Sequence, residues 1–255
     1  MPDLPAMDIA RPGILRVPRA YHAVFAQARC ESFEWGDLEV RCHHWQGSAP
    51  VLCVHGSNGN AAQFGALIEG LLAAGRGVLA VDIPSHNPRG RFIPSTFIWE
   101  ALVQTQRYAE PAAVVAHSMA CSWAMRALNE GLAAKRLICL SPAATQDYVF
   151  QRFLELQQAQ GLTMDALAAE IDEAFGLTWR LAYSPIELCK TLSLPTLIHH
   201  DEEDPIIEIE AGARALRGVW PNAQYIETRG LGHSGVFRNA WLIERLIDFI
   251  QCDAP

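Results

Sequence analysis

The chain has 255 residues, of which 50% are hydrophobic and 19% charged, and its net charge at pH 7 is −8. This length and composition are typical of one large globular domain with a well-buried core, and they exclude a disordered chain. The acidic balance argues against a nucleic-acid-binding surface, which would need clustered Lys and Arg.

The cysteines and the N-terminus indicate the cellular compartment to expect. The seven cysteines are scattered, mostly in apolar segments, with no C-x-x-C pair and no metal-ligand spacing. We therefore expect reduced core cysteines in a cytoplasmic protein. The start of the chain has no basic segment followed by an apolar core, and no run of eighteen apolar residues occurs, so we expect neither a signal peptide nor a membrane span.

The first half of the chain alternates strands and helices. Residues 1–30 are weakly patterned, and we expect them to wrap the domain. Gly36-Asp37 lies between short alternating runs in 34–45, which predicts an antiparallel hairpin at a sheet edge, with His43 and His44 on opposite faces of its second strand. We predict buried strands at 49–54, 77–82 and 112–116, and helices at 61–74, from Ser95 or Thr96 to 109, and from Ser122 to Gly131.

The second half continues the alternation, with strands predicted at 136–140, 195–199 and 224–228 and a closing helix at 239–251. Apolar strands that alternate with helices predict an α/β protein whose mostly parallel central sheet is flanked by helices.

One interval, between Leu140 and Leu194, is longer than a single crossover needs, and helical patterns occupy 146–160 and 163–175. We predict that 143–190 is a helical cap inserted over the C-terminal edge of the sheet, and that 1–142 and 191–255 form the core domain. The alternative is a group of helices packed on the flank of that domain.

A single serine, Ser118, stands where the strand at 112–116 turns into the next helix. This strand–serine–helix turn is the geometry of a nucleophile elbow, in which the residues two before and two after the serine must be small. Ala116 and Ala120 occupy those positions, where the pattern G-x-S-x-G has glycine, so the motif is less specific than usual. The alternative is a buried strand that ends at an incidental serine.

Three other loops follow predicted strands, at the sheet edge where function gathers in open parallel sheets. In His55-Gly56-Ser57, the glycine frees the backbone, and we assign the amide of Ser57 to an oxyanion hole, with the amide of Met119 as the second donor. The alternative is a plain glycine turn. His233 is surrounded by glycines, which indicates a loop that approaches other groups closely and not an apolar core face.

The loop at 199–207 holds four acids, and we expect one of them to orient a histidine. Asp204 is the choice, because Pro205 fixes the loop just after it, and Asp201 is the second choice. A solvated turn or a weak cation site are the alternatives for this acidic loop.

In chain order, the motifs V-H-G, A-H-S-M-A, D-E-E-D-P-I-I and G-L-G-H resemble those of the α/β-hydrolase family, and the resemblance covers about residues 34–252. It implies Ser118 as nucleophile, His233 as general base, Asp204 as the acid that orients it, and Ser57 and Met119 as oxyanion donors. The sequence departs from the family pattern at the two elbow alanines and at residue 201, where relatives often have glycine.

The expected reaction is hydrolysis of a small-molecule carboxylic ester through an acyl-enzyme, with no metal or organic cofactor. Apolar residues of the predicted cap favour an uncharged, apolar substrate of modest size; they are Val149, Phe150, Phe153, Leu154, Phe175 and Trp179. His86 and Trp99 are further candidates for the pocket lining, although packing is the favoured role for each.

Several alternatives stay open at this point. Thioesterases, C–C bond hydrolases, acyltransferases, perhydrolases and hydroxynitrile lyases share the Ser-His-Asp triad, whereas haloalkane dehalogenases and epoxide hydrolases are disfavoured because they place aspartate where Ser118 stands. A ligand receptor without activity and a metal-dependent hydrolase built on His199-His200-Asp201 are the alternatives of other classes. The sequence does not determine the oligomeric state or the physiological ester.

Overall fold

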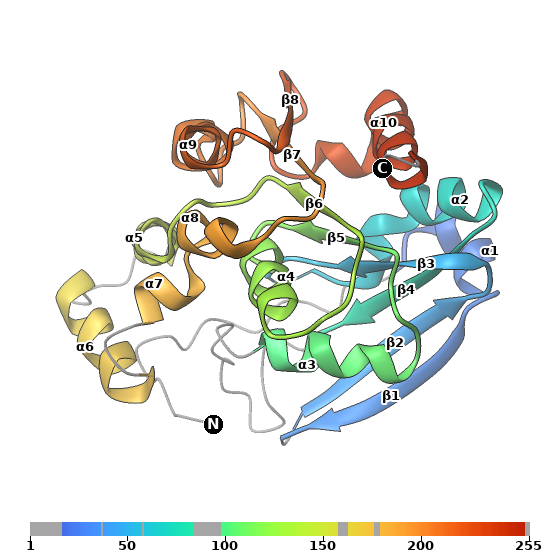
Figure 1. Ribbon diagram of the computed structural model, residues 1–255, viewed down its shortest axis with the longest axis horizontal. Coiled ribbons are helices and arrows are strands. Elements are labelled where there is room, and N and C mark those ends of the chain that lie inside the picture. Colours follow the sequence, from blue (N-terminus) through green and yellow to red (C-terminus); the bar gives the residue numbers. More distant parts are fainter. Residues whose placement is uncertain are drawn as a thin grey trace.

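The computed structural model describes residues 17–36, 38–57, 59–83, 98–157, 163–175 and 179–252. Within these ranges one sheet contains eight strands in the order β1-β2-β4-β3-β5-β6-β7-β8 (Figure 1). The strands are β1 (Arg29–Trp35), β2 (Leu38–Trp45), β3 (Ser48–Val54), β4 (Arg76–Asp82), β5 (Ala113–His117), β6 (Arg136–Leu140), β7 (Thr196–Asp201) and β8 (Gln224–Thr228). β2 is antiparallel to β1 and β4, and all other pairs are parallel, which confirms the predicted mostly parallel sheet.

The antiparallel edge is the predicted hairpin. Trp35 pairs with Leu38 across a two-residue turn, and Gly36 takes a φ of +63°, a left-handed conformation that costs glycine little. The pairing extends back to Arg29 opposite His44, so the first strand begins earlier than the sequence pattern predicts. Asp37, the second turn residue, lies outside the described residues.

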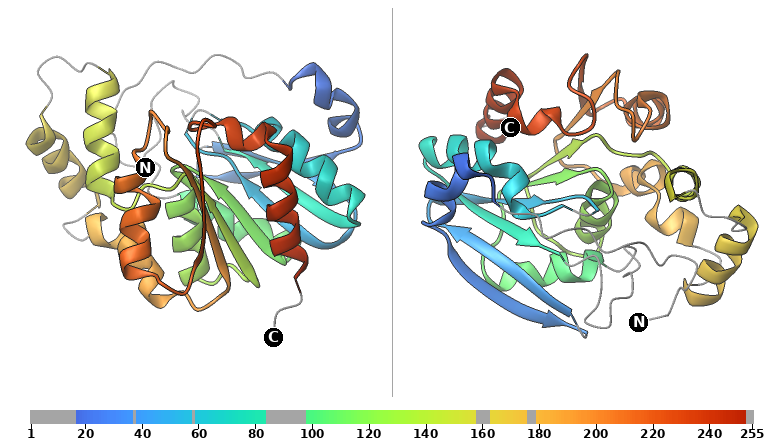
Figure 2. Two further views of the ribbon diagram at one scale, coloured as in Figure 1. Left: turned by 90° about the horizontal axis from the view of Figure 1, so that it is seen from above. Right: turned by 180° about the vertical axis from the view of Figure 1, so that it is seen from behind.

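Helices cover both faces of the sheet because apolar side chains alternate along its strands. Leu52 and Val54 of β3 belong to one core cluster, and Val51 and Cys53 belong to the other. Figure 2 shows α2 and α10 side by side on the second cluster's face. The helices on that face are α1 (His22–Phe25), α2 (Gly65–Ala73) and α10 (Ala240–Gln251); those on the other are α3 (Ile98–Gln104), α4 (Ala120–Asn129), α8 (Pro185–Leu188) and α9 (Ala213–Val219).

Outside the interval between β6 and β7, two short helices, α1 and α9, are absent from the sequence prediction, because four and seven residues give too little periodicity to detect. The predicted helix at 61–74 is confirmed as a 3-10 turn, Ala61–Phe64, that continues into α2. Residues 1–16, His86 and the predicted helix start at Ser95 or Thr96 lie outside the described residues. Among the helices of the described ranges, none is both long and apolar enough to cross a bilayer.

The interval between β6 and β7 contains helices, as predicted. They are α5 (Gln146–Gln157), α6 (Met164–Phe175), α7 (Trp179–Tyr183) and α8. Figure 1 shows α5, α6 and α7 beyond the end of the sheet where the parallel strands terminate. The guanidinium of Arg152 on α5 donates to the carbonyls of Pro205 and Ile206 at 3.1 and 3.3 Å, so α5 packs on the loop that follows Asp204. That this insertion caps a substrate stays a prediction.

Candidate active site

Ser118 lies at the turn between β5 and α4, with a φ of +56° that residues other than glycine rarely adopt. Its amide donates to the carbonyl of Leu140 on β6 at 2.8 Å, and its carbonyl accepts from the amide of Cys121 at 3.0 Å. Ala116 and Ala120 are fully buried, so the elbow accommodates a methyl group at both positions. The surrounding hydrogen bonds therefore hold the serine in a strained conformation at the C-terminal end of a central strand.

The loop after β3 packs directly against this elbow. A methyl group on Gly56 would lie 2.9 Å from the Cβ of Ser118 and 3.0 Å from the carbonyl oxygen of His117, so only glycine fits there. Ser57 follows on the exposed side of the loop. Among the described residues, no backbone carbonyl accepts a hydrogen bond from the amide of Ser57 or of Met119. Both amides are thus available to an anionic oxygen, and their assignment to an oxyanion hole stays a prediction.

His55 fixes the same loop, a role that the sequence did not reveal. Its Nε2 accepts from the amide of Ile83 at 2.9 Å, so Nδ1 carries the proton and donates to the carbonyl of Gly56 at 2.7 Å. Burial lowers the pKa of this imidazole, which keeps it neutral. The histidine before the glycine in V-H-G is therefore a structural clamp between the ends of β3 and β4.

The structure brings Asp204 and His233 together. Nδ1 of His233 donates to Oδ2 of Asp204 at 2.7 Å, and Oδ1 of the same carboxylate accepts from the amides of Ile206 and Ile207 at 2.9 and 3.0 Å. Burial alone would raise the pKa of Asp204, but hydrogen bonds from His200 and His233 hold it well below its usual range. An ionised carboxylate bound to Nδ1 fixes the ring so that Nε2 can accept a proton.

Asp201, the second choice for the acid, has a different function in the fold. Its buried carboxylate accepts from the hydroxyl of Thr228 at 2.7 Å and from the amides of Leu231 and Gly232 at 3.0 Å each. These bonds hold the backbone of the loop that carries His233. The side chain of Asp201 orients the loop, whereas that of Asp204 contacts the imidazole ring of His233.

His200 lies behind the Asp204 carboxylate, which the sequence did not indicate. Its Nε2 donates to the carbonyl of Ile207 at 2.8 Å and lies 3.4 Å from Oδ2 of Asp204. His199, the preceding residue, points to the opposite face of β7, as neighbours on a strand do. In the part of the chain that the structure describes, no three His, Cys, Asp or Glu side chains are arranged to hold a metal ion, and the His199-His200-Asp201 run is no exception.

His117 joins the elbow to the loop of His233. Its Nε2 donates to the backbone carbonyl of His233 at 2.9 Å, and the two rings lie 4.7 Å apart. Burial, with a smaller effect from the neighbouring His233, lowers the pKa of His117 to about 3 and keeps it neutral. Because His117 precedes Ser118, the predicted nucleophile and base lie at the same sheet edge. Within the described residues no hydrogen bond joins the Ser118 hydroxyl to the His233 ring; such contacts often form only with substrate bound.

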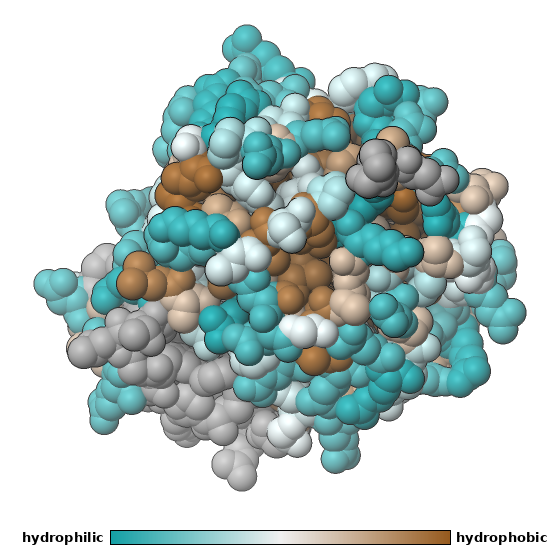
Figure 3. Space-filling view, in the orientation of Figure 1, coloured by the Kyte–Doolittle hydropathy of each residue, from teal (hydrophilic) through white to brown (hydrophobic). Residues whose placement is uncertain are grey.

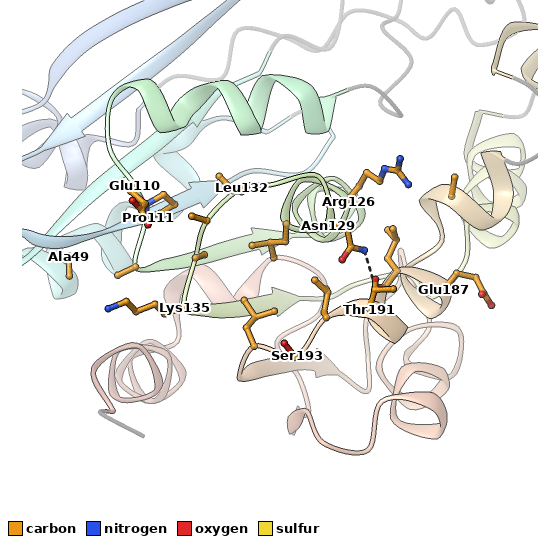
Figure 4. A pocket seen from close by; sticks show the side chains of 18 of the residues that line it. Ala49, Glu110, Pro111, Arg126, Asn129, Leu132, Lys135, Glu187, Thr191 and Ser193 are labelled. Atoms are coloured by element: carbon orange, nitrogen blue, oxygen red, sulfur yellow. Dashed lines mark hydrogen bonds between the residues drawn. The ribbon is translucent and has the colours of Figure 1, made fainter. Parts of the chain in front are cut away.

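A surface hollow of about 1220 Å³ lies at the opposite end of the strands (Figure 4). Among its lining residues, Ala112, Lys135 and Leu194 come one or two residues before β5, β6 and β7, and Asn129 ends α4. The hollow is therefore separate from the edge that holds Ser118. On the face shown in Figure 3, apolar side chains gather in the middle of the molecule and polar ones surround them.

Comparison with known proteins agrees with this architecture. Similar solved structures include an esterase of Pyrococcus furiosus, with 18% identity, a TM-score of 0.66, and 95% of this chain and 97% of that chain covered. They also include an esterase from Exiguobacterium antarcticum (16% identity, TM-score 0.63, 84% and 96% covered) and a meta-cleavage product hydrolase from Pseudomonas fluorescens IP01 (16%, 0.62, 86% and 96%). No curated protein sequence matches significantly.

Identities this low show a shared fold and nothing finer. The match to a family is more specific, because the model of the Alpha/beta hydrolase family aligns with residues 51–245, most of the chain. The aligned segment contains the elbow, the loop after β3, and the loops that carry the aspartate–histidine pair. The chain therefore belongs to the α/β-hydrolase family.

Proposed function

We propose that the protein is a serine hydrolase that cleaves carboxylic esters of small to medium-sized apolar compounds. The observation that carries this proposal is the 2.7 Å contact between His233 Nδ1 and Asp204, on the same sheet edge as the strained elbow of Ser118. A carboxylate, an imidazole and a serine hydroxyl, supplied in this way by separate loops, are the parts that acyl transfer through an enzyme-bound ester requires.

The proposed reaction has two halves. In the first, Nε2 of His233 takes the proton of Ser118 while the serine oxygen attacks the ester carbonyl carbon. The amides of Ser57 and Met119 stabilise the oxyanion, and the leaving alcohol departs with the proton held by His233. In the second, His233 activates a water molecule, which attacks the acyl-enzyme and releases the carboxylic acid and free Ser118.

The preference for apolar substrates rests on the insertion between β6 and β7. On α5, Phe150 is buried, and Val149 and Leu154 are half-buried. The side chains of Phe153, Phe175 and Trp179 lie outside the described residues. Trp99, a candidate lining residue, packs instead under the guanidinium of Arg126, 5.5 Å from the ring centroid, which supports its packing role.

A second candidate is hydrolysis of a carbon–carbon bond by the same residues. The similarity to a meta-cleavage product hydrolase favours it, although at 16% identity that similarity extends to the fold alone. A panel of p-nitrophenyl esters of increasing acyl length, run beside thioesters and a vinylogous diketone, separates these candidates. Turnover of the esters supports the proposal, and turnover of the diketone alone supports the second candidate.

The direct test is Ser118→Ala, which should lower kcat for p-nitrophenyl esters by up to about 10⁶-fold and abolish labelling by a fluorophosphonate probe. Ser193→Ala is the matched control, because Ser193 is exposed and lines the hollow at the other end of the strands. It should retain both activity and labelling. Labelling or full turnover in Ser118→Ala would show that Ser118 is not the nucleophile.

A further inference from the structure

A second carboxylate–imidazole pair lies on the hairpin side of the sheet. Nε2 of His43 contacts Oδ2 of Asp82 at 2.7 Å, and Nδ1 of the same ring lies 3.3 Å from the thiol sulfur of Cys30. Cys30 is directly opposite His43 in the β1–β2 pairing, and β2 pairs in turn with β4, which ends at Asp82. Three neighbouring strands thus bring a thiol, a base and an acid into successive contact.

The chemistry of the three groups determines which atoms carry the protons and which accept them. Burial alone would raise the pKa of Asp82, but hydrogen bonds from His43 and from the amide of Ala61 lower it, so the carboxylate is ionised and can only accept. Nε2 of His43 therefore carries the proton, Nδ1 is the acceptor, and the thiol of Cys30 donates to it. An imidazole in this position can take the thiol proton, and the carboxylate behind it stabilises the resulting cation.

The surroundings shield the base and leave the thiol open. The side chain of His43 is 12% exposed, because the rings of Phe25 and Trp45 lie against it with centroids 5.7 and 6.2 Å away. Cys30 itself is exposed. Five of the other cysteines are buried, and only Cys252 shares this exposure. Reagents in solution can therefore reach a thiol whose proton acceptor is fixed in place.

We propose that Cys30 is a reactive thiol that forms a mixed disulfide with a low-molecular-weight disulfide of the glutathione type. His43 takes the proton from Cys30, whose sulfur attacks one sulfur of the small disulfide. A bond forms between these two sulfurs while the bond inside the small disulfide breaks, and the departing thiolate receives the proton from His43. The products are the protein mixed disulfide and one free small thiol, so no further oxidant or reductant is consumed.

No resolving thiol lies beside the adduct, because Cys53, which is on the same face, is fully buried and two strands separate β1 from β3. Cys42 is the nearest cysteine in the sequence, but it lies one position from His43 on β2 and therefore points to the other face of the sheet. Burial, with a smaller effect from Asp82, raises the pKa of Cys42 to about 12, so this thiol stays protonated. The reaction at Cys30 thus ends at the mixed disulfide and does not proceed to an internal disulfide.

The test uses the full chain, with Cys252 as an internal reference thiol. The protein is incubated with glutathione disulfide at pH 7, quenched with acid at intervals and digested, and the adduct at each of the two cysteines is quantified by mass spectrometry. Cys30 should react about threefold or more faster than Cys252, because a base lies 3.3 Å from its sulfur and can take the proton as the sulfur attacks. Equal rates at the two cysteines would overturn the proposal.

Two variants test the base and the acid. His43→Gln should bring the rate at Cys30 down to that of Cys252, and Asp82→Asn should give an intermediate rate, while the rate at Cys252 stays constant in both. Circular dichroism and fluorophosphonate labelling verify the fold, and Asp82→Asn alone decides the matter if His43→Gln does not fold. A rate at Cys30 that is unchanged in the folded variant would overturn the proposed role of this pair.

Discussion

Two carboxylate–histidine pairs of the same length occur among the described residues, and their surroundings differ. The contact between Asp204 and His233 and the contact between Asp82 and His43 both measure 2.7 Å. The Asp204 carboxylate is fully buried, whereas that of Asp82 is 30% exposed. The first pair shares a sheet edge with Ser118, and the second faces a thiol. A well-formed carboxylate–imidazole contact therefore does not specify a reaction by itself; the group on the far side of the ring does.

Strand direction explains this difference. The parallel strands β3, β5, β7 and β8 end at one edge, so the loops after them converge and can surround a substrate with amides and side chains. β2 runs antiparallel between β1 and β4, so its side chains meet partners across the strand pairs. That arrangement brings three side chains into contact across neighbouring strands and leaves the thiol exposed, which suits a reaction with small reagents from solution.

The largest effect expected within this comparison distinguishes Asp204 from Asp82. Asp204→Asn should lower kcat/KM for p-nitrophenyl esters by about 10⁴-fold, because an amide no longer stabilises the imidazolium or fixes the correct tautomer. Asp82→Asn should leave ester hydrolysis unchanged. Initial rates of both purified variants provide the measurement. A comparable loss in the two variants would mean that the hairpin pair takes part in ester hydrolysis, and the distinction drawn between the regions would fail.

Gly56→Ala tests the close approach between the loop after β3 and Ser118. The new methyl group would lie 2.9 Å from the Cβ of Ser118, so the elbow or the loop must shift, and a displacement of this kind costs about 10²-fold in rate. Gly218→Ala is the matched control: nothing lies within 4 Å of the added methyl, and alanine should stabilise the end of α9 by up to about 1 kcal/mol. Steady-state kinetics and thermal melts follow both variants. Full activity in Gly56→Ala would contradict the packing of this loop on the elbow.

Much of the fold was predictable because local patterns determine it. The alternation of apolar strands with helices predicts the mostly parallel sheet, and the strand–serine–helix turn locates Ser118. The turn at Gly36 even fixes the hairpin register, since a two-residue turn that pairs Trp35 with Leu38 also pairs Cys30 with His43. The opposite orientations predicted for His43 and His44 are confirmed in the same way: the first contacts Asp82 and the second packs on Tyr108.

The remaining features depend on contacts between segments that no local pattern encodes. The position of Asp82 beside His43 requires the pairing of β2 with β4, which skips over β3 in the sequence. Likewise, His200 reaches the Asp204 carboxylate only because the acidic loop folds back on β7. Charge and spacing left a cation site open as an alternative for that loop and favoured Asp204 through Pro205, but they could not reveal that the Asp201 carboxylate binds the backbone of the His233 loop.

Asp201→Asn tests whether the two aspartates of the acidic loop, Asp201 and Asp204, have different roles. The carboxylate accepts hydrogen bonds from Thr228, Leu231 and Gly232, and an amide in its place leaves at least one buried donor poorly paired. The free energy of unfolding should fall by about 1–3 kcal/mol. Ester hydrolysis should fall far less than in Asp204→Asn, because the ring of His233 keeps its own carboxylate. Urea titrations and kinetics together test this, and a kinetic loss as large as that of Asp204→Asn would make Asp201 the orienting acid.

The smallest expected effect concerns burial, the last difference between the two regions. His199 is fully buried beside the acidic loop; burial, and then the neighbouring His200, lower its pKa to about 4, while the charges of Asp201 and Asp204 oppose this shift. An unfolded histidine has a pKa of about 6.5. Below that pH the unfolded chain therefore binds a proton that the folded chain does not bind. The stabilisation is complete above about pH 6.5 and is lost as the pH falls from there through the folded pKa of about 4.

His199→Gln should therefore show a shallower fall in the free energy of unfolding between pH 7 and pH 4.5, measured by urea titration at several pH values. Parallel curves for the variant and the wild type would mean that folding does not lower the pKa of His199, and that the end of β7 is more accessible to water than its packing indicates.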